Sequence, residues 1–270
     1  MSHGNTGKTS RRHYFLNPNI ISSNRAAAFF MPATPFTGEI KPSTESEKTS
    51  ERWCGDTLKR LTRLHQFSGG DCGISQVPSY RCFRGAYGDP SYKHLLVDFR
   101  IVPPDEARAL HFPPELKTVW SFKTFVINPM KYLPWLMKRF RDGGGHMVQY
   151  KVHSLKELSD YDVIVNCSRL GARELAGDLS VYPVRGQLVA VRAPWIKHFW
   201  LHGEYDLSTL VHILPHDGEV ILGGVAEPNV WSTDPNPATT DGIYKKCLEL
   251  CPDLKGAEEL YSWALQPLRE

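Results

Sequence analysis

Residues 162–195 contain the combination of residue types that most strongly predicts a ligand site. A β-branched run at residues 163–165 ends in the polar sequence Asn-Cys-Ser at residues 166–168, and a turn at Gly171 follows. In open α/β sheets, ligands bind at the carboxyl ends of strands, where such turns bring backbone N–H groups close to the ligand. We therefore expect the segment around Ser168 to border a bound ligand.

Other groups of reactive residues predict no separate catalytic centre. His198 and His202 have a spacing that places two side chains on one face of a helix, but no acidic residue or cysteine stands at metal-ligand spacing from them. We therefore expect no metal site. Residues 4–9 are two residues too short between their glycines for a phosphate-binding loop and follow no predicted strand, so we interpret them as a polar terminus.

Composition and charge are those of an ordinary folded protein. The chain has 270 residues, of which 41% are hydrophobic and 23% are charged, and its formal net charge is +3. Because these charges are spread along the sequence, we expect no nucleic-acid partner. The sequence has no apolar run long enough to span a bilayer and no secretory signal, so we expect neither membrane insertion nor secretion. The six cysteines are accordingly expected to be free thiols.

Short strands alternate with isolated helices along the chain. Residues 52–67 place apolar side chains at helical spacing, whereas residues 74–83 and 120–127 have the character of strands. Residues 39–51 are polar and are expected to form a loop. This pattern predicts an α/β or α+β protein with a mixed sheet. Further strands are expected at 98–102, 148–152, 162–167, 187–192, 210–214 and 219–223, and further helices at 105–110, 129–141 and 240–251.

Three motifs follow one another at fixed spacing in the second half of the chain. They consist of Asn166, Cys167, Ser168, Gly171, Ala172, Arg173, Leu175, Gly177 and Asp178, then Pro183 to Gln187, then Ala193, Pro194, Trp195, His198 and Phe199. Together they resemble the D-amino-acid oxidase and D-aspartate oxidase family of flavoenzymes. The resemblance extends over most of the chain from about Ser22 onward, and residues 132–136 are similar to D-aspartate oxidases in particular.

The resemblance implies an α/β fold in which an incomplete Rossmann-like FAD-binding domain is interleaved with a mixed-sheet α+β substrate domain. Residues 1–50 and 143–182 would form the remnant of the FAD-binding domain, and residues 51–142 and 183–270 the substrate domain. It also implies an FAD-dependent oxidoreductase that oxidatively deaminates D-amino acids, acidic ones favoured, in the peroxisome. In that reaction a hydride passes from the substrate α-carbon to the flavin, and dioxygen reoxidises the flavin.

The family positions transfer to this chain residue by residue. His212 stands where the family has a Tyr that binds the substrate α-carboxylate, and Gln266 stands where the family has an Arg that holds the same carboxylate. These two residues are therefore the expected substrate contacts. The expected cofactor contacts are Ser22, Ser23, Ala27, Ala28, Val152 and Ser168.

Several positions depart from the family pattern. The chain contains no G-x-G-x-x-G sequence, and the residues before Ser22 predict no strand that would precede such a turn. Arg169 stands at a family glycine, where a side chain is poorly suited if the backbone needs a positive φ. Gln266 lacks the charge of the family Arg, and Ala226 replaces a basic residue of D-aspartate oxidases. The sequence ends at Glu270, before the glycine-rich segment with which the family holds the flavin ring.

These departures leave three interpretations open. The first is an FAD-dependent D-amino-acid oxidase. The second is a catalytically silent member of the family that acts as a binding or interaction protein. The third is an incomplete gene model of a longer oxidase, which neighbouring transcript sequence would reveal. Oligomeric state and the preferred D-amino acid are not determined by the sequence.

Overall fold

The computed structural model describes residues 13–16, 26–32, 44–68, 70–203, 210–265 and 268–269. Ser22, Ser23 and Gln266, which we expect to contact cofactor or substrate, lie outside these ranges, and so do residues 4–9.

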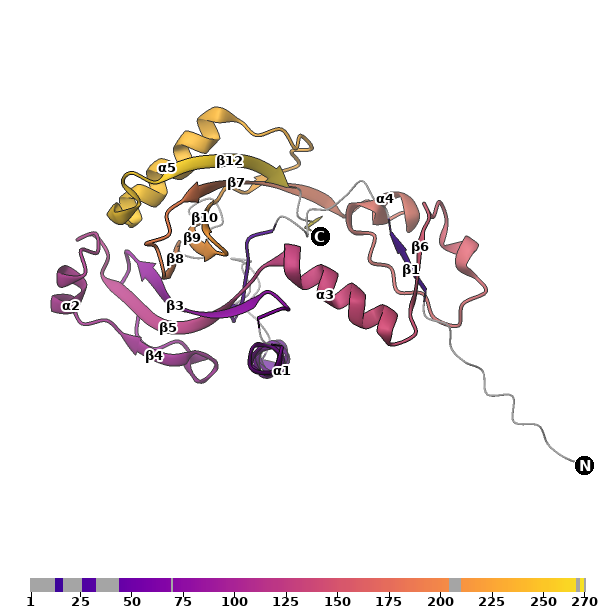
Figure 1. Ribbon diagram of the computed structural model, residues 1–270, viewed down its shortest axis with the longest axis horizontal. Coiled ribbons are helices and arrows are strands. Elements are labelled where there is room, and N and C mark those ends of the chain that lie inside the picture. Colours follow the sequence, from indigo (N-terminus) through magenta and orange to yellow (C-terminus); the bar gives the residue numbers. More distant parts are fainter. Residues whose placement is uncertain are drawn as a thin grey trace, which may run out of the picture.

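A mixed sheet of eleven strands forms the centre of the described structure (Figure 1). Its strand order is β11-β7-β10-β9-β8-β3-β5-β2, with β12 and β13 also pairing with β7 and β4 with β5. β3 and β8 pair in parallel, whereas pairs such as β9–β10 are antiparallel, so the mixed sheet predicted from the sequence is confirmed. The strands are β2 (Ala28–Phe29), β3 (Ile74–Phe83), β4 (Val97–Ile101), β5 (Thr118–Ile127), β7 (Tyr182–Arg192), β8 (Phe199–His202), β9 (Val211–His216), β10 (Glu219–Gly223), β11 (Glu227–Pro228), β12 (Glu258–Leu265) and β13 (Leu268–Arg269).

A second, two-stranded sheet lies at one end of the molecule (Figure 1). It pairs β1 (His13–Leu16) in parallel with β6 (His146–Gln149). The expectation that no strand precedes Ser22 is therefore wrong. The sequence HYFL is too short to show a period of its own, and parallel pairing with β6 defines it as a strand.

Five α-helices complete the described structure, together with short 3₁₀ turns. α1 begins within residues 39–51, where the sequence predicts a loop, and that prediction is wrong from Thr44 onward. Polar Glu and Lys residues in this segment are good helix formers, although they supply no apolar stripe. The helices are α1 (Thr44–Phe67), α2 (Pro104–Ala109), α3 (Pro129–Asp142), α4 (Ala172–Leu175) and α5 (Pro237–Leu250), and the 3₁₀ turns are η2 (Lys93–Leu95), η3 (Leu155–Leu158), η4 (Arg169–Gly171) and η6 (Pro252–Leu254).

The predicted strand at residues 162–167 is absent from the described structure. This segment forms no ladder, and Val163 and Val165 are 78% and 77% exposed. A β-branched run becomes a strand only when a neighbouring strand satisfies its backbone groups. Among the described residues, β6 pairs with β1 alone, so residues 162–167 have no such neighbour. The prediction is wrong for this reason.

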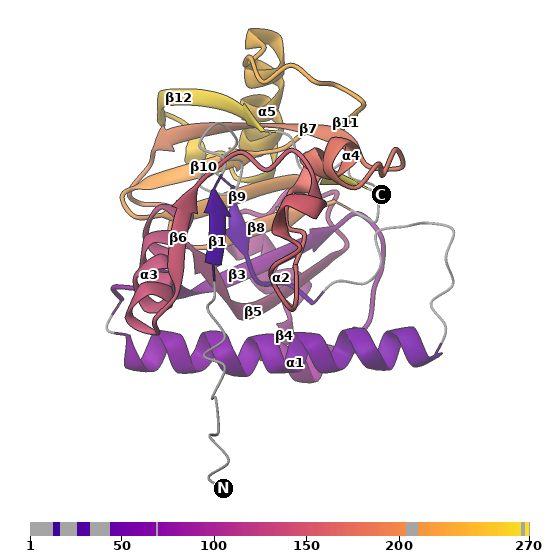
Figure 2. The same cartoon turned by 90° about the vertical axis from the view of Figure 1, so that its right-hand side faces the viewer.

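Alternation along the strands gives the large sheet two different faces. On one face Cys82, Val189 and Ile213 pack together with residues of α5. On the other, which we call the inner face, Leu201 and Leu214 pack with the segment around β2. α1 and α5 lie on the outer sides of the curved sheet, and β2 lies between its two arms (Figures 1 and 2).

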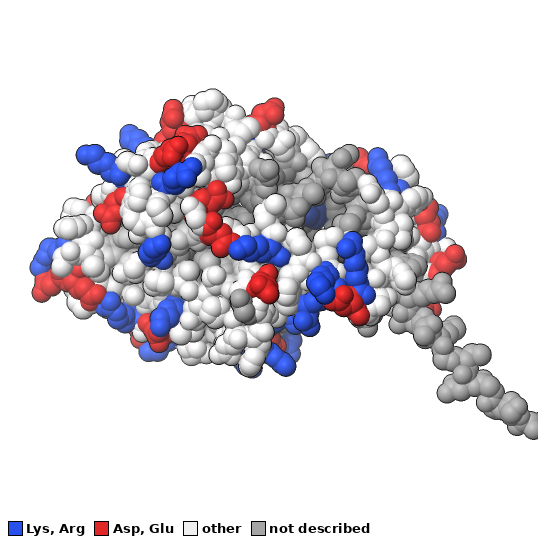
Figure 3. Space-filling view, viewed as in Figure 1, with Lys and Arg blue, Asp and Glu red and all other residues white. Residues whose placement is uncertain are grey.

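Charge is dispersed over the described part of the face that Figure 3 shows. Basic and acidic side chains are interspersed on the face shown in Figure 3, without a broad region of one sign in its described part. No helix among the described residues is long and apolar enough to cross a membrane. Nor do the described His, Cys, Asp and Glu side chains form a group of three or more that could hold a metal ion.

Candidate functional site

His212 occupies a closely packed position on the inner face of the sheet. It lies in β9 opposite Gly223 of β10, and a methyl group on Gly223 would collide with the imidazole ring. The ring is buried, and neither Nδ1 nor Nε2 has a hydrogen-bond partner among the described residues. Burial penalises the imidazolium form and lowers the pKa of His212 to about 4. His212 is therefore a neutral, unpartnered polar group in an apolar region.

The segment at β2 meets this histidine. Ala28 and Phe29 pair with Ile127 and Val126 of β5, at the edge of the sheet. The Phe29 ring lies with its centroid 6.2 Å from that of His212 and 4.6 Å from that of Phe199. Ala27 and Ala28, two small residues expected beside the cofactor, thus belong to the same short segment as Phe29, whose ring lies near the expected substrate residue His212.

Ala27 also packs against the cluster of buried residues on the inner face. This part of the predicted site is therefore assembled from segments that are far apart in the sequence, because β2, β5, β8 and β9 meet in one sheet. The same packing fills the space above His212 with the Phe29 side chain.

Val152 and Ser168 lie elsewhere in the fold. Val152 follows β6 and is half-buried, and Ser168 precedes α4, at the end of the molecule that carries the two-stranded sheet (Figure 1). The Ser168 backbone N–H donates to Asn166 Oδ1 at 3.1 Å, whereas the buried Ser168 Oγ has no partner among the described residues. The four described cofactor candidates thus fall into two groups, Ala27 and Ala28 at β2 and Val152 and Ser168 near the two-stranded sheet.

Arg169 confirms the constraint on this turn. Its φ is +57°, a left-handed conformation that glycine adopts readily and that a side chain with a Cβ disfavours. The family glycine that Arg169 replaces therefore corresponds to a real requirement of the backbone in this chain.

A buried polar network surrounds Arg185, which is 3% exposed. Its guanidinium forms an ion pair with Glu227 and donates to Gln187 Oε1 at 2.6 Å and to the Asp234 carbonyl at 2.7 Å. Gln187 in turn donates from Nε2 to Thr240 Oγ1 at 2.8 Å. Arg185 thus joins β7 to β11 and to the segment before α5.

Arg185 and Gln187 belong to a motif that carries the family resemblance, and the sequence alone assigns them no role. Its signal was present, because an Arg and a Gln two residues apart on a strand point to the same face. Their partners could not be predicted, since Glu227 and Thr240 are about forty to fifty residues away in the sequence and are placed by the fold.

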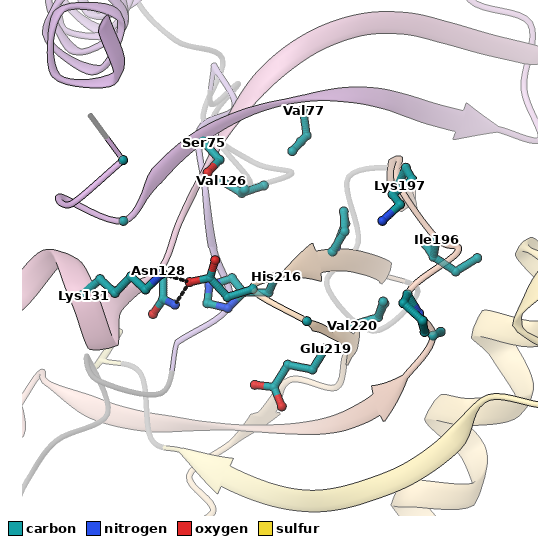
Figure 4. A pocket seen from close by; sticks show the side chains of 17 residues that line it. Ser75, Val77, Val126, Asn128, Lys131, Ile196, Lys197, His216, Glu219 and Val220 are labelled. Carbon is teal, nitrogen blue, oxygen red and sulfur yellow. Dashed lines mark hydrogen bonds and ion pairs between the residues drawn. The ribbon is translucent and has the colours of Figure 1, made fainter. Parts of the chain in front are cut away.

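A cavity of about 280 Å³ opens at the turn between β9 and β10 (Figure 4). Asp217 lies in that turn, accepting a hydrogen bond from Asn128 Nδ2 at 2.6 Å and pairing with Lys131 Nζ at 2.8 Å. The hydrogen bond from Lys131 is the main reason why the pKa of Asp217 is lowered. His212 is not among the described residues that line this cavity, so the cavity is separate from that expected substrate contact.

An FAD molecule needs a site for its pyrophosphate as well as one for its flavin ring. The pyrophosphate normally rests on a helix N-terminus that follows a glycine-rich turn. Among the described residues, the helices of eight or more residues begin at Thr44, Pro129 and Pro237, and no glycine-rich turn precedes any of them. The described residues therefore provide no such site for the pyrophosphate of FAD.

Comparison with known proteins identifies the wider group. The sequence model of the family described as FAD dependent oxidoreductase matches residues 17–270. D-aspartate oxidase from Homo sapiens is 33% identical over 213 residues, which cover 77% of this chain and 60% of the relative. D-amino-acid oxidase from Rubrobacter xylanophilus is 39% identical over 178 residues, which cover 66% of this chain and 53% of the relative.

A solved structure shares the fold of this chain. A crystal structure of glycine oxidase from Geobacillus kaustophilus superposes with a TM-score of 0.71 at 17% identity, covering 96% of this chain and 76% of that protein. The chain spans only about half to three fifths of the length of the two curated relatives above. The family match nevertheless extends over almost the whole sequence, and the chain belongs to the FAD dependent oxidoreductase family.

Proposed function

We propose that this chain carries the substrate side of an FAD-dependent D-amino-acid oxidase, and that acidic D-amino acids are its preferred substrates. The observation that carries the proposal is the buried, unpartnered imidazole of His212, which faces the segment containing Ala27 and Ala28. Buried polar side chains without a partner are rare in folded proteins and call for an explanation. A substrate carboxylate bound at His212 provides one.

The preference for acidic substrates rests on similarity. The human relative is named D-aspartate oxidase, and residues 132–136 resemble that group. In this chain the expected anchoring is weaker than in the family, because Gln266 offers one neutral amide where an Arg–carboxylate pair is charge-assisted and roughly twice as strong.

A chain extended at both ends with sequence from a D-aspartate oxidase relative tests the proposal. We call this chain the completed protein. We expect this protein to bind FAD and to oxidise D-aspartate slowly. Gln266→Arg should raise kcat/KM, and His212→Tyr should raise it further. Because both side chains are proposed to hold one carboxylate, the double variant should depart from the product of the single effects.

Oxygen consumption with D-aspartate, D-alanine and L-aspartate measures the rates. Efficient oxidation of D-aspartate by the unmodified completed protein, with no gain from Gln266→Arg, would show that the substrate carboxylate is held by other residues. Absence of oxidation by every variant, despite bound FAD, would refute the proposed activity.

A second function has its own support. Phe29 packs over His212, and the described residues provide no site for the pyrophosphate of FAD, which favours a catalytically silent binding protein. We would then expect the 270-residue chain to be stable and monodisperse without flavin, and the completed protein to show no oxidase activity. Measurable oxidation of a D-amino acid by the completed protein would eliminate this alternative.

Peroxisomal location is proposed from the family resemblance alone. A fluorescent fusion of the completed protein should overlap with a peroxisomal marker in cells. Diffuse fluorescence would contradict the proposal.

A further inference from the structure

Arg81 is a buried cation without an acidic partner among the described residues. The residue lies in β3 and is 4% exposed. Its guanidinium donates one hydrogen bond, from NH1 to Tyr92 Oη at 3.0 Å, and its Nε has no partner among the described residues. The carbon at the centre of the guanidinium lies 5.1 Å from the Phe83 ring centroid and 5.8 Å from that of Trp120. Cation–π contacts offset part of the desolvation of the charge, but they leave the N–H donors unsatisfied.

Trp120 presents a second unsatisfied donor beside this cation. It lies directly opposite Arg81 in the β3–β5 ladder and is 4% exposed. Its indole Nε1 also has no partner among the described residues. Arg81 and Trp120 thus combine a positive charge and at least two free N–H groups within one aromatic cluster. Donors of this kind match a carboxylate, which accepts several hydrogen bonds and carries the opposite charge.

The strand register connects this pair to His212. Arg81 stands opposite Leu201 of β8, and Leu201 stands opposite His212 of β9. Directly opposed residues of neighbouring strands point to the same face of a sheet, so Trp120, Arg81, Leu201 and His212 form one row on the inner face. Since neighbouring strands lie about 4.8 Å apart, the Cα atoms of Arg81 and His212 are roughly 10 Å apart.

Unsatisfied polar atoms are concentrated in this row. Five buried side-chain nitrogen and oxygen atoms in the described structure have no partner, and four of them belong to Arg81, Trp120 and His212. Met31 packs against both the inner-face cluster and the aromatic cluster beside Arg81, so one short segment covers both ends of the row. If unsatisfied groups were placed by chance, they would not be expected to gather in a single row.

We propose that Arg81 and Trp120 form a carboxylate subsite, and that this subsite and His212 together select a short dicarboxylate. One carboxylate binds the Arg81 guanidinium and the Trp120 indole N–H, and the other binds His212. This inference rests on the proposed function, because it identifies the residue that gives the substrate site its preference for acidic ligands. The segment carrying Phe29 and Met31 covers the row, so it must move aside when the ligand enters. The ladder that holds this segment to β5 is short, because β2 contributes only two residues to it.

Binding of succinate to the 270-residue chain tests the subsite directly. In a ¹H–¹⁵N spectrum, succinate should shift the indole N–H resonance of Trp120, which a Trp120→Phe variant identifies by its loss. Acetate has only one carboxylate and should bind at least about tenfold more weakly. Arg81→Gln should weaken succinate binding by at least about tenfold, because it removes both the charge and the planar fork of donors.

Two further variants serve as controls. Arg84→Gln removes an exposed positive charge three residues away and should leave succinate affinity within about twofold of the wild type. Arg81→Lys keeps the charge and loses the fork, so it should weaken binding severalfold; it also replaces Arg81→Gln if that variant fails to fold. Succinate binding that is equal to acetate binding, or that is unchanged in Arg81→Gln or Arg81→Lys, would overturn the proposal.

The assay contains no FAD and measures no turnover. A chain that binds succinate through Arg81 but whose completed form oxidises nothing would support the subsite and refute the oxidase function. A completed protein that oxidises D-aspartate equally well with and without Arg81 would support the oxidase function and refute the subsite.

Discussion

At the residue scale, unusual chemistry is confined to a few positions. His212 and Arg81 are buried without the partners that such groups normally have, and Arg169 holds a left-handed backbone conformation. The sequence singled out His212 and Arg169 through the family resemblance, and the role of His212 in holding substrate stays a prediction. Arg81 was not predictable, because nothing in the sequence around it shows that its strand places it between Trp120 and Leu201.

Replacement of Arg169 tests the backbone requirement at the turn. A non-glycine residue at positive φ is strained by about 1 kcal/mol or more, so Arg169→Gly should raise the free energy of unfolding by about that amount. Arg169→Ala keeps the Cβ and should give no such gain, which separates backbone strain from loss of the side chain. Urea unfolding measures both variants. Equal stability of the Gly and Ala variants would show that the strain is absent.

His212 should make stability depend on pH. Burial lowers its pKa to about 4, whereas an unfolded histidine has a pKa of about 6.5. The unfolded chain therefore takes up the proton first as pH falls. The stabilisation due to the neutral ring is present above about pH 6.5 and is lost as pH falls towards 4, with a loss of about 2 kcal/mol between about pH 7.5 and pH 5.

Urea unfolding at these two pH values measures that loss. His212→Gln should reduce the difference between the two free energies by about 2 kcal/mol, whatever its effect on stability at either pH alone. Replacement of the exposed His153 by Gln is the matched control and should leave the difference unchanged. An unaltered difference in His212→Gln would mean that the ring is solvated or partnered in solution.

At the element scale, the local sequence pattern predicts a strand or helix correctly where the fold supplies the neighbouring strand or the capping residue that the element needs. The expected bounds of β3 and β10 agree with the structure, and α3 and α5 each begin after an Asn whose side chain accepts a backbone N–H. β12 was not predicted, because its pairing with β7 and not a local alternation defines it. Residues 162–167 show the converse, since a strong β pattern without a neighbour forms no strand.

The exposed run at Val163 to Val165 should promote self-association. An exposed apolar segment that belongs to no ladder can pair with another chain. We expect light scattering to rise with protein concentration and to fall in a Val163→Ser, Val165→Ser double variant. Leu179→Ser removes a similarly exposed apolar side chain at 74% exposure and should have little effect. A monomeric wild-type chain at high concentration would contradict this prediction.

At the scale of the whole molecule, the described structure contains two sheets of very different size. The eleven-stranded sheet is extensive, whereas the two-stranded sheet of β1 and β6 is small. The division into a remnant at residues 1–50 and 143–182 and a substrate domain at residues 51–142 and 183–270 stays a prediction. β2 lies within the first remnant in sequence but pairs in the large sheet, as expected for interleaved segments.

The sequence predicted the family and the class of fold, because motif spacing depends on the covalent chain. It could not predict that Phe29 would pack over His212, because that contact depends on how β2 pairs with β5. The packing of Phe29 over His212 therefore follows from the tertiary fold and not from the local sequence.

Flavin binding by the purified 270-residue chain tests the central claim most directly, namely that this chain carries the substrate side of a flavoenzyme and that its described residues offer no site for the cofactor pyrophosphate. We expect a colourless preparation, and a titration with FAD followed by flavin fluorescence that shows weak binding or none. A completed protein, with family sequence at both ends, should purify yellow. A yellow preparation of the 270-residue chain, with a protein-bound flavin spectrum at stoichiometric occupancy, would contradict the account.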